Sequence, residues 1–147
     1  LASAYAVIPN AEIRQKFLDK TVGYMLTDGN VFAFQTTVAA YEQGEEWLSQ
    51  LLSYIQGNID FLTQYIDQHL PKVKYIVPQA SYLIFLDFRQ LGLSQKELVS
   101  LCTNQAHLAL VDGSVFGKEG IGFMRINLAS PRSVIEKAAQ QLSAVSS

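Results

Sequence analysis

The fold of this 147-residue chain is best approached from the stretch Gly122-Phe123-Met124-Arg125-Ile126-Asn127-Leu128-Ala129. It is a short predicted strand, apolar nearly throughout, with one charged residue, Arg125. Successive side chains of a strand point to opposite faces. One face of this strand carries Phe123, Arg125 and Asn127. The other face carries Met124, Ile126 and Leu128. A strand with one uniformly apolar face predicts a sheet packed on one side against a hydrophobic core.

Arg125 needs a partner on its own face. A guanidinium does not lose its proton among apolar neighbours, so it requires an anion or a carbonyl oxygen. Its planar fork matches a carboxylate through two parallel hydrogen bonds. The residues alone leave two readings open. The carboxylate belongs either to a ligand or to an acidic side chain of the same chain, with a surface arginine as a variant of the second reading.

The segments around this strand predict an α+β domain of order β-β-α-β-β-α from residue 73 onward. Strands are expected at 73–77, 81–88, 109–111 and 122–129. Ser94 and Glu97 form a capping box for a helix that runs to about Asn104. Ser130 is expected to cap the last helix, with Pro131 at its first position. The residues expected to be buried in that helix are Val134, Ala138, Leu142 and Val145.

The longest predicted element is a helix from about Glu45 to His69. Its apolar residues recur at alternating spacings of four and three, which is typical of a helix packed along its length. They are Leu48, Leu52, Ile55, Ile59, Leu62 and Ile66. At 1.5 Å per residue it spans roughly 37 Å. Of a coiled-coil partner and a spine between two domains, the spine is favoured, because Gly57 interrupts a stripe that is shorter than four heptads.

The first part of the chain predicts a short strand, 5–8, followed by a helix that Asn10 caps. Ile13, Phe17 and Leu18 are expected to form the buried stripe of that helix. A turn is expected at 27–30, and a second helical stretch begins near Phe32, with the break-prone Gly44 inside it.

Composition excludes several classes of function. A net charge of −2 without a basic block gives nucleic acid nothing to bind. No apolar stretch approaches the roughly 18–20 residues of a membrane helix, and the sequence shows no signal-peptide pattern, so a cytoplasmic location is expected. The single Cys102 predicts a packed thiol in a reducing compartment. His69 and His107 alone predict no metal site. The hydrophobic fraction of 49% hints at surface covered by another subunit or by further chain.

Four stretches together resemble a known enzyme family. They are residues 3–10, 39–48, 81–89, and 112–117 continuing to 122–132. The most specific pieces are Gly-Phe-Met-Arg, which ends at Arg125, and Ala-Ser-Pro-Arg, which ends at Arg132. The chain is similar to the C-terminal part of a pyridoxal-phosphate (PLP) dependent C–S lyase of the cystathionine β-lyase type, within the fold-type-I aminotransferase superfamily. The piece Gly-Glu-Glu-Trp-Leu, which begins at Gly44, points to the lyase branch.

The resemblance implies roles for particular residues. Arg125 would bind the α-carboxylate of an amino-acid substrate, and Asn127 would steady it from the same face. Asn30 would lie near the cofactor of a neighbouring subunit, although a plain turn asparagine explains it equally well. Arg132 follows a helix cap and is expected to be structural.

The resemblance also implies what this chain does not carry. The Schiff-base lysine of the family belongs to a Ser-x-x-Lys motif before the position of Leu1, and the other PLP-binding residues lie further upstream. No catalytic residue is therefore expected here, nor is bound PLP. The absence of an initiator methionine suggests a fragment, inactive alone and completed by an N-terminal large domain. The expected division is a large-domain tail, 1–44, an interdomain helix, 45–71, and a small domain, 72–147.

For the intact enzyme, the resemblance implies a homodimer that converts cystathionine or a related cysteine S-conjugate to pyruvate, ammonia and a thiol. Two alternatives remain open. One is an aminotransferase that uses the same parts, and the other is a non-catalytic α+β binding module that never meets PLP.

Overall fold

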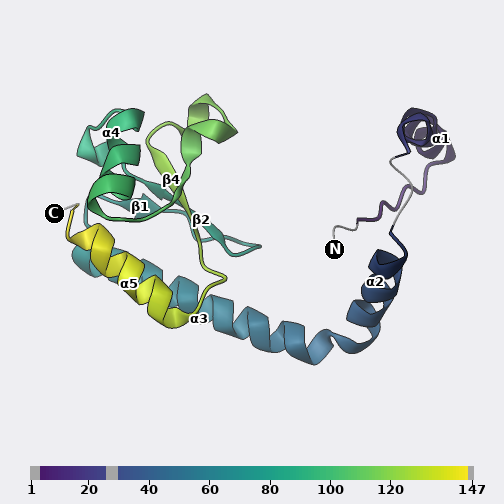
Figure 1. Cartoon of the computed structure of the whole chain (residues 1–147), viewed down its shortest axis with the longest axis horizontal. Coiled ribbons are helices and arrows are strands. Elements are labelled where there is room, and N and C mark those ends of the chain that lie inside the picture. Colours follow the sequence, from purple (N-terminus) through teal and green to yellow (C-terminus); the bar gives the residue numbers. More distant parts are fainter. Residues whose placement is uncertain (1–3, 26–29, 146–147) are drawn as a thin grey trace. The chain divides into compact units, whose positions relative to one another are not determined.

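The computed structural model describes residues 4–25 and 30–145 (Figure 1). These form two compact units, divided between Gln50 and Leu51. The division falls inside helix α3 (Glu45–His69), which has the predicted bounds and continues through Gly57 without interruption.

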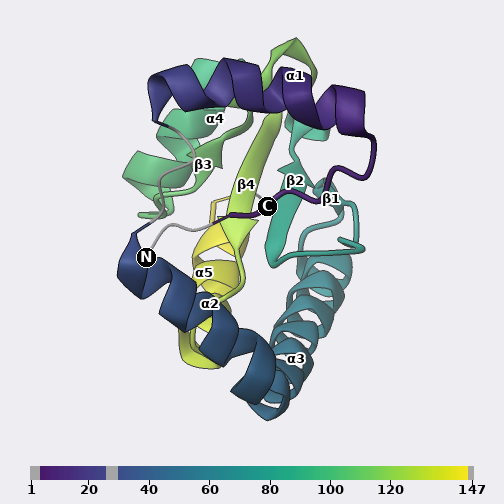
Figure 2. The same cartoon turned by 90° about the vertical axis from the view of Figure 1, so that its right-hand side faces the viewer.

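The second unit is built on a four-stranded antiparallel sheet. Its strands are β1 (Lys74–Tyr75), β2 (Leu83–Asp87), β3 (Val111–Asp112) and β4 (Phe123–Asn127). Their spatial order is β1-β2-β4-β3, so that β4 lies between β2 and β3 (Figure 2). The predicted order β-β-α-β-β-α is confirmed. The third strand lies slightly later than predicted, because only Val111 and Asp112 find partners on β4.

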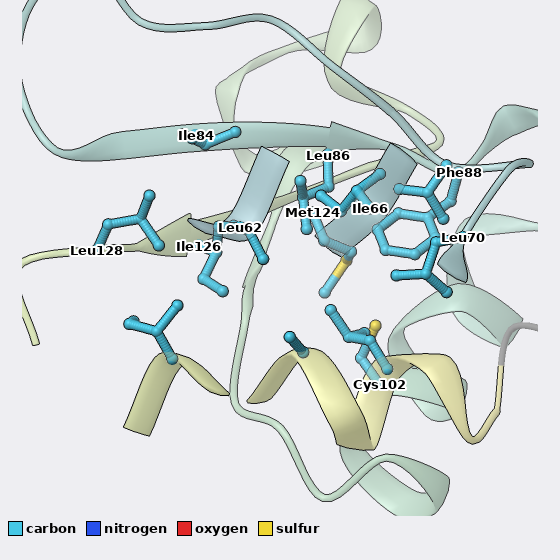
Figure 3. Packing of buried hydrophobic residues seen from close by; sticks show 14 of the residues in the cluster. Leu62, Ile66, Leu70, Ile84, Leu86, Phe88, Cys102, Met124, Ile126 and Leu128 are labelled. Carbon is cyan, nitrogen blue, oxygen red and sulfur yellow. The ribbon is translucent and has the colours of Figure 1, made fainter. Parts of the chain in front are cut away.

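One face of the sheet is covered by the end of α3, by α4 (Gln95–Ser100) with the π-turn that follows it, Leu101–Gln105, and by α5 (Arg132–Ser143). Met124, Ile126 and Leu128 of β4 point into this core, as their alternation predicts. Figure 3 shows them packed with Ile84, Leu86 and Phe88 from the β2 segment. The α3 side of the core contains Ile55, Ile59, Leu62 and Ile66.

Two predictions about the ends of the apolar stripes were wrong. Leu48 and Leu52, at the start of α3, are exposed. Leu51, the neighbour of Leu52, packs against the core instead. In α5, Val134 is 52% exposed and its neighbour Ile135 is 2% exposed. Adjacent helix positions differ by about 100°, and packing selects the stripe of Ile135 over that of Val134.

The start of α5 also differs from its prediction. Pro131 occupies the N-cap position, and no side chain caps the helix. The carbonyl of Ser130 instead accepts a hydrogen bond from Asn58 Nδ2, at 3.0 Å. Asn58 Nδ2 donates a second bond, of 2.9 Å, to the carbonyl of Leu128, and Asn58 is completely buried. This amide therefore joins α3 to the chain leaving β4, and the apolar periodicity of α3 gives no sign of it.

The first unit contains α1 (Ala11–Thr21), a short 3-10 helix, Val22–Tyr24, and α2 (Val31–Gln43), which ends at Gly44. Asn10 caps α1 as predicted, since its Oδ1 accepts a bond from the Ile13 amide. The predicted strand 5–8 is absent from the described part of this unit, because a strand requires a ladder partner and these residues find none. Residues 27–29 of the predicted turn lie outside the described residues.

The predicted buried stripe of α1 is exposed. Ile13 is 59%, Phe17 45% and Leu18 37% exposed. Apolar periodicity identifies the face of a helix that favours burial, but it does not identify the residues that pack against that face. Among the described residues, no helix is long and apolar enough to cross a membrane.

Candidate functional site

Arg125 lies at the centre of β4, on the face of the sheet opposite the core. It is half-buried, and its direct partners on the neighbouring strands are Phe85 of β2 and Val111 of β3. The β2 and β4 residues on this face are half-buried or exposed within the second unit, whereas those on the other face are buried. The alternation that buries Met124 and Ile126 therefore also presents the guanidinium on the open side.

The guanidinium rests on an aromatic ring. Its Cζ atom lies 4.6 Å from the ring centroid of Phe116, which ends the 3-10 turn η4 (Gly113–Phe116). The ring of Phe85 meets Phe116 edge-on, at a centroid distance of 5.5 Å and an interplanar angle of 80°. A cation held over a ring in this way has fewer orientations open to it than a free side chain.

No acidic side chain occupies the fork. Within residues 4–25 and 30–145, Arg125 forms no ion pair, and its Nε atom is buried without a hydrogen-bond partner. The alternative of an internal carboxylate bridge is therefore wrong for the described chain. A half-buried, unpaired, planar cation is the arrangement that a ligand carboxylate satisfies best.

Arg89 provides an internal comparison. Its Nε and Nη2 atoms donate to the two carboxylate oxygens of Asp87, at 2.9 and 2.7 Å, and its Cζ lies 4.9 Å from the centroid of Phe123. The Arg89 guanidinium lowers the pKa of the Asp87 carboxyl. Arg89 thus has both an aromatic neighbour and a carboxylate, whereas Arg125 has only the aromatic neighbour.

Asn127 shares the open face but forms no hydrogen bond with Arg125 in the described structure. It is exposed, and its Oδ1 accepts a bond of 2.8 Å from the amide of Ala129. That contact shapes the end of β4. A role in substrate binding stays a prediction, with the amide nitrogen as the group left to perform it.

Asn30 lies in the first unit, where it caps α2. Its Oδ1 accepts a bond of 2.8 Å from the amide of Phe32, and the residue is exposed. A helix cap accounts for this geometry, and its role beside a cofactor stays a prediction. Arg132 behaves as a structural residue. Its amide donates to Tyr54 Oη, at 2.7 Å, and its Cζ lies 4.9 Å from the centroid of Phe61.

The lysines and the cysteine are the other potentially reactive groups of this chain. All seven lysines are exposed, so none occupies a desolvated pocket: they are Lys16, Lys20, Lys72, Lys74, Lys96, Lys118 and Lys137. Cys102 is fully buried, and burial raises the pKa of its thiol to about 11. It is a packed core residue, as predicted, because the reactive thiolate is disfavoured there.

Sequence reasoning found Arg125 but missed the two rings that support it. Phe85 directly opposes Arg125 across the β2–β4 pair. Aligning the two predicted strands in antiparallel register would have found it. Phe116 sits in a turn, and no periodicity locates it.

Comparison with known proteins identifies the class to which this fold and site belong. No protein-family model matches the chain. The crystal structure of cystalysin from Treponema denticola, which contains a pyridoxal 5'-phosphate cofactor, is 27% identical with a TM-score of 0.88, over 95% of this chain and 35% of that one. The chain therefore has the fold of the corresponding part of PLP-dependent enzymes of the aminotransferase superfamily.

Sequence relatives define the family more narrowly. The chain is 33% identical to Protein MalY of Escherichia coli K12 over 97% of its length, and 34% identical to cystathionine beta-lyase PatB of Bacillus subtilis 168 over 98%. It belongs to the PLP-dependent C–S lyases of the cystathionine β-lyase type and corresponds to their C-terminal part. The resemblance found in the four sequence stretches is confirmed. The chain spans 37% of the length of each of these two relatives.

Proposed function

We propose that this chain supplies the substrate-carboxylate site of a C–S lyase. The reaction is β-elimination from cystathionine or a related cysteine S-conjugate, with pyruvate, ammonia and a thiol as products. The observation that carries the proposal is the unpaired fork of Arg125 on the open face of the sheet. Relatives named cystathionine beta-lyase support the substrate class.

The residues of this chain do not fit a covalently held PLP. Attachment requires a lysine whose amine is neutral and close to the cofactor, and every lysine here is exposed. When bound, PLP supplies the electron sink for the loss of an α-proton and a β-substituent. We assign its attachment, and the acid–base chemistry, to an N-terminal large domain outside these 147 residues. Residues 1–44 would belong to that domain, 45–71 would link it to the small domain, 72–147, and the complete enzyme would be a homodimer.

The part played by this chain is positioning. A carboxylate bound by both arms of the Arg125 fork loses its freedom to rotate, which fixes the α-carbon that carries it relative to the reacting groups. Lysine at the same position would keep the charge but present a point donor instead of a fork.

The test uses the complete enzyme that contains this chain. Charged hydrogen bonds are worth about 1.5–3 kcal/mol, so Arg125→Lys is expected to raise KM for cystathionine by roughly 10- to 100-fold. The matched control is Arg89→Lys, at an arginine already paired with Asp87, and its KM should stay within about twofold of the unmodified enzyme. An unchanged KM in Arg125→Lys would remove the carboxylate role.

The same preparation separates the lyase from its alternatives. Pyruvate released from cystathionine or cysteine supports the lyase. Amino-group transfer from an amino acid to a keto acid, without release of pyruvate, would replace it with an aminotransferase. Neither activity in the complete, PLP-loaded protein would favour the non-catalytic module.

A further inference from the structure

We infer that Phe116 is a positioning residue for substrate binding, which holds the fork of Arg125 in the plane and direction that the carboxylate requires. This inference rests on the proposed function, because it gives Phe116 its role through Arg125. It concerns a residue on an exposed turn, separate in sequence from the strand that carries the arginine.

The contacts of the Arg125 guanidinium determine which of its nitrogen atoms are available to a ligand. Its Cζ atom lies over the ring of Phe116, and the rings of Phe116 and Phe85 form a T-shaped pair. Nε is buried without a partner, whereas neither terminal nitrogen is among the buried, unpartnered atoms of the described residues. The edge formed by the two terminal nitrogens is therefore the one open to a ligand.

The turn that carries Phe116 is held in place by hydrogen bonds. Asp112 Oδ1 accepts a bond of 2.8 Å from the amide of Ser114 and another of 2.6 Å from Gln95 Nε2. Gln95 Oε1 in turn accepts a bond of 2.6 Å from the amide of Gly122, at the entry to β4. One glutamine therefore ties the turn of Phe116 to the strand of Arg125.

Two glycines fix the same turn by close packing. Gly113 and Gly120 approach so closely that a Cβ atom on either residue would overlap the carbonyl of the other. Gly113 begins the turn η4, and Gly120 ends the next 3-10 turn, η5 (Lys118–Gly120). This packing leaves the turn little freedom to shift relative to β4.

Burial within this chain does not explain why an aromatic residue stands at position 116, because Phe116 is 53% exposed and is not part of the hydrophobic core. Its contact with the unpaired Arg125 gives the ring a role within the described residues. Its π face favours one orientation of the cation without neutralising its charge.

The experiment replaces the ring in the complete enzyme. Phe116→Leu keeps apolar bulk but removes the π face, and it should raise KM for cystathionine about fivefold, with kcat changed less than about twofold. Phe116→Trp restores a π face and should keep KM within about twofold of the unmodified enzyme. Val115→Ala, in the same turn and at a residue that is 68% exposed, is the matched control, with an unchanged KM.

A second readout does not depend on activity. In the NMR spectrum of the 147-residue chain, the ring should shield the Arg125 Hε proton, and Phe116→Leu should remove that upfield shift. Circular dichroism of each variant checks that the fold is intact. An Hε resonance that does not move in folded Phe116→Leu would overturn the inference, as would a KM unchanged by that substitution.

The KM values of the two variants separate the role of Phe116 from that of Arg125. If Arg125→Lys raises KM and Phe116→Leu does not, the carboxylate site stands and the role of Phe116 is wrong. If Arg125→Lys leaves KM unchanged, the site itself is wrong. In the Arg125→Lys background, Phe116→Leu should add less than about twofold to KM, because the ring acts through the planar fork. Independent, multiplicative effects of the two substitutions would contradict that coupling.

Discussion

Asn58→Asp is expected to destabilise the second unit severely, although it replaces one amide nitrogen by an oxygen. Asn58 is completely buried, and its Nδ2 donates to the carbonyls of Leu128 and Ser130, at 2.9 and 3.0 Å. An aspartate at neutral pH has no donor for either carbonyl. It would also place a negative charge against two acceptor oxygens in the interior.

The magnitude follows from these contacts. Each buried acceptor that loses its donor costs about 1–3 kcal/mol, and an uncompensated buried charge alone costs about 3–5 kcal/mol. Because these costs overlap, we expect the free energy of unfolding to fall by about 3–5 kcal/mol at pH 7. Burial would raise the pKa of the introduced carboxyl, so the loss should shrink as the pH falls through that value and the protonated group regains one donor.

The measurement is urea unfolding followed by circular dichroism, at pH 7 and at successively lower pH. The matched control is Asn104→Asp, the same chemical change at an exposed residue whose amide donates to Ser100 Oγ, at 3.0 Å. It should cost less than about 1 kcal/mol. A loss below about 1 kcal/mol for Asn58→Asp, or one that grows as the pH falls, would refute the reasoning.

Three further outcomes are expected. Burial raises the pKa of the Cys102 thiol to about 11, so ionisation of this thiol should not change the free energy of unfolding below about pH 8.5. As the pH rises towards 11, that free energy should fall by roughly 2 kcal/mol, because the unfolded chain loses the thiol proton first. Urea unfolding at each pH measures the fall, and Cys102→Ala should not show it. Arg89 lowers the pKa of Asp87, so the pair should stabilise the fold above about pH 4 and cease to do so as the pH falls through the lowered value. Arg89→Gln should therefore lower Tm at pH 7, and the difference in Tm from the unmodified chain should shrink as the pH falls below about 4. In Gly113→Ala, the added Cβ would press against the carbonyls of Gly120 and Phe123, and unfolding free energy should fall by about 1–3 kcal/mol, whereas no change would contradict the close packing of the turn.

The elements with strong local signals could be predicted from the sequence. The 25-residue helix α3 has the predicted bounds, because its apolar stripe and the break at Gly44 are both local features. The capping box of Ser94 and Glu97 is present with both of its hydrogen bonds. Predictions about what covers an apolar face failed more often, as with Ile13 in α1 and Val134 in α5. Cover depends on residues distant in sequence, which periodicity does not encode.

The candidate site shows the same division. Arg125 could be found because a charge inside an apolar alternation contradicts its surroundings. Phe116 could not, since its contact with Arg125 results from a turn whose position depends on Gln95 and on the packing of Gly113. Asn58 was missed for a related reason. A buried amide within an apolar stripe looks like an interruption until its two carbonyl partners, 70 and 72 residues away, are seen.

The alternation along β4 limits how the chain can change in length. An insertion of one residue between Gly122 and Arg125 would shift the register of β4 and exchange its two faces. The guanidinium would then point into the hydrophobic core, and a methionine or isoleucine would occupy its position on the opposite face of the sheet. An insertion in the connection between β1 and β2, residues 76–82, would not exchange the faces of a strand, because most of that connection has no ladder partner. Natural variation in length is therefore expected to accumulate in that connection and to spare the six positions that lead from Gly122 to Asn127.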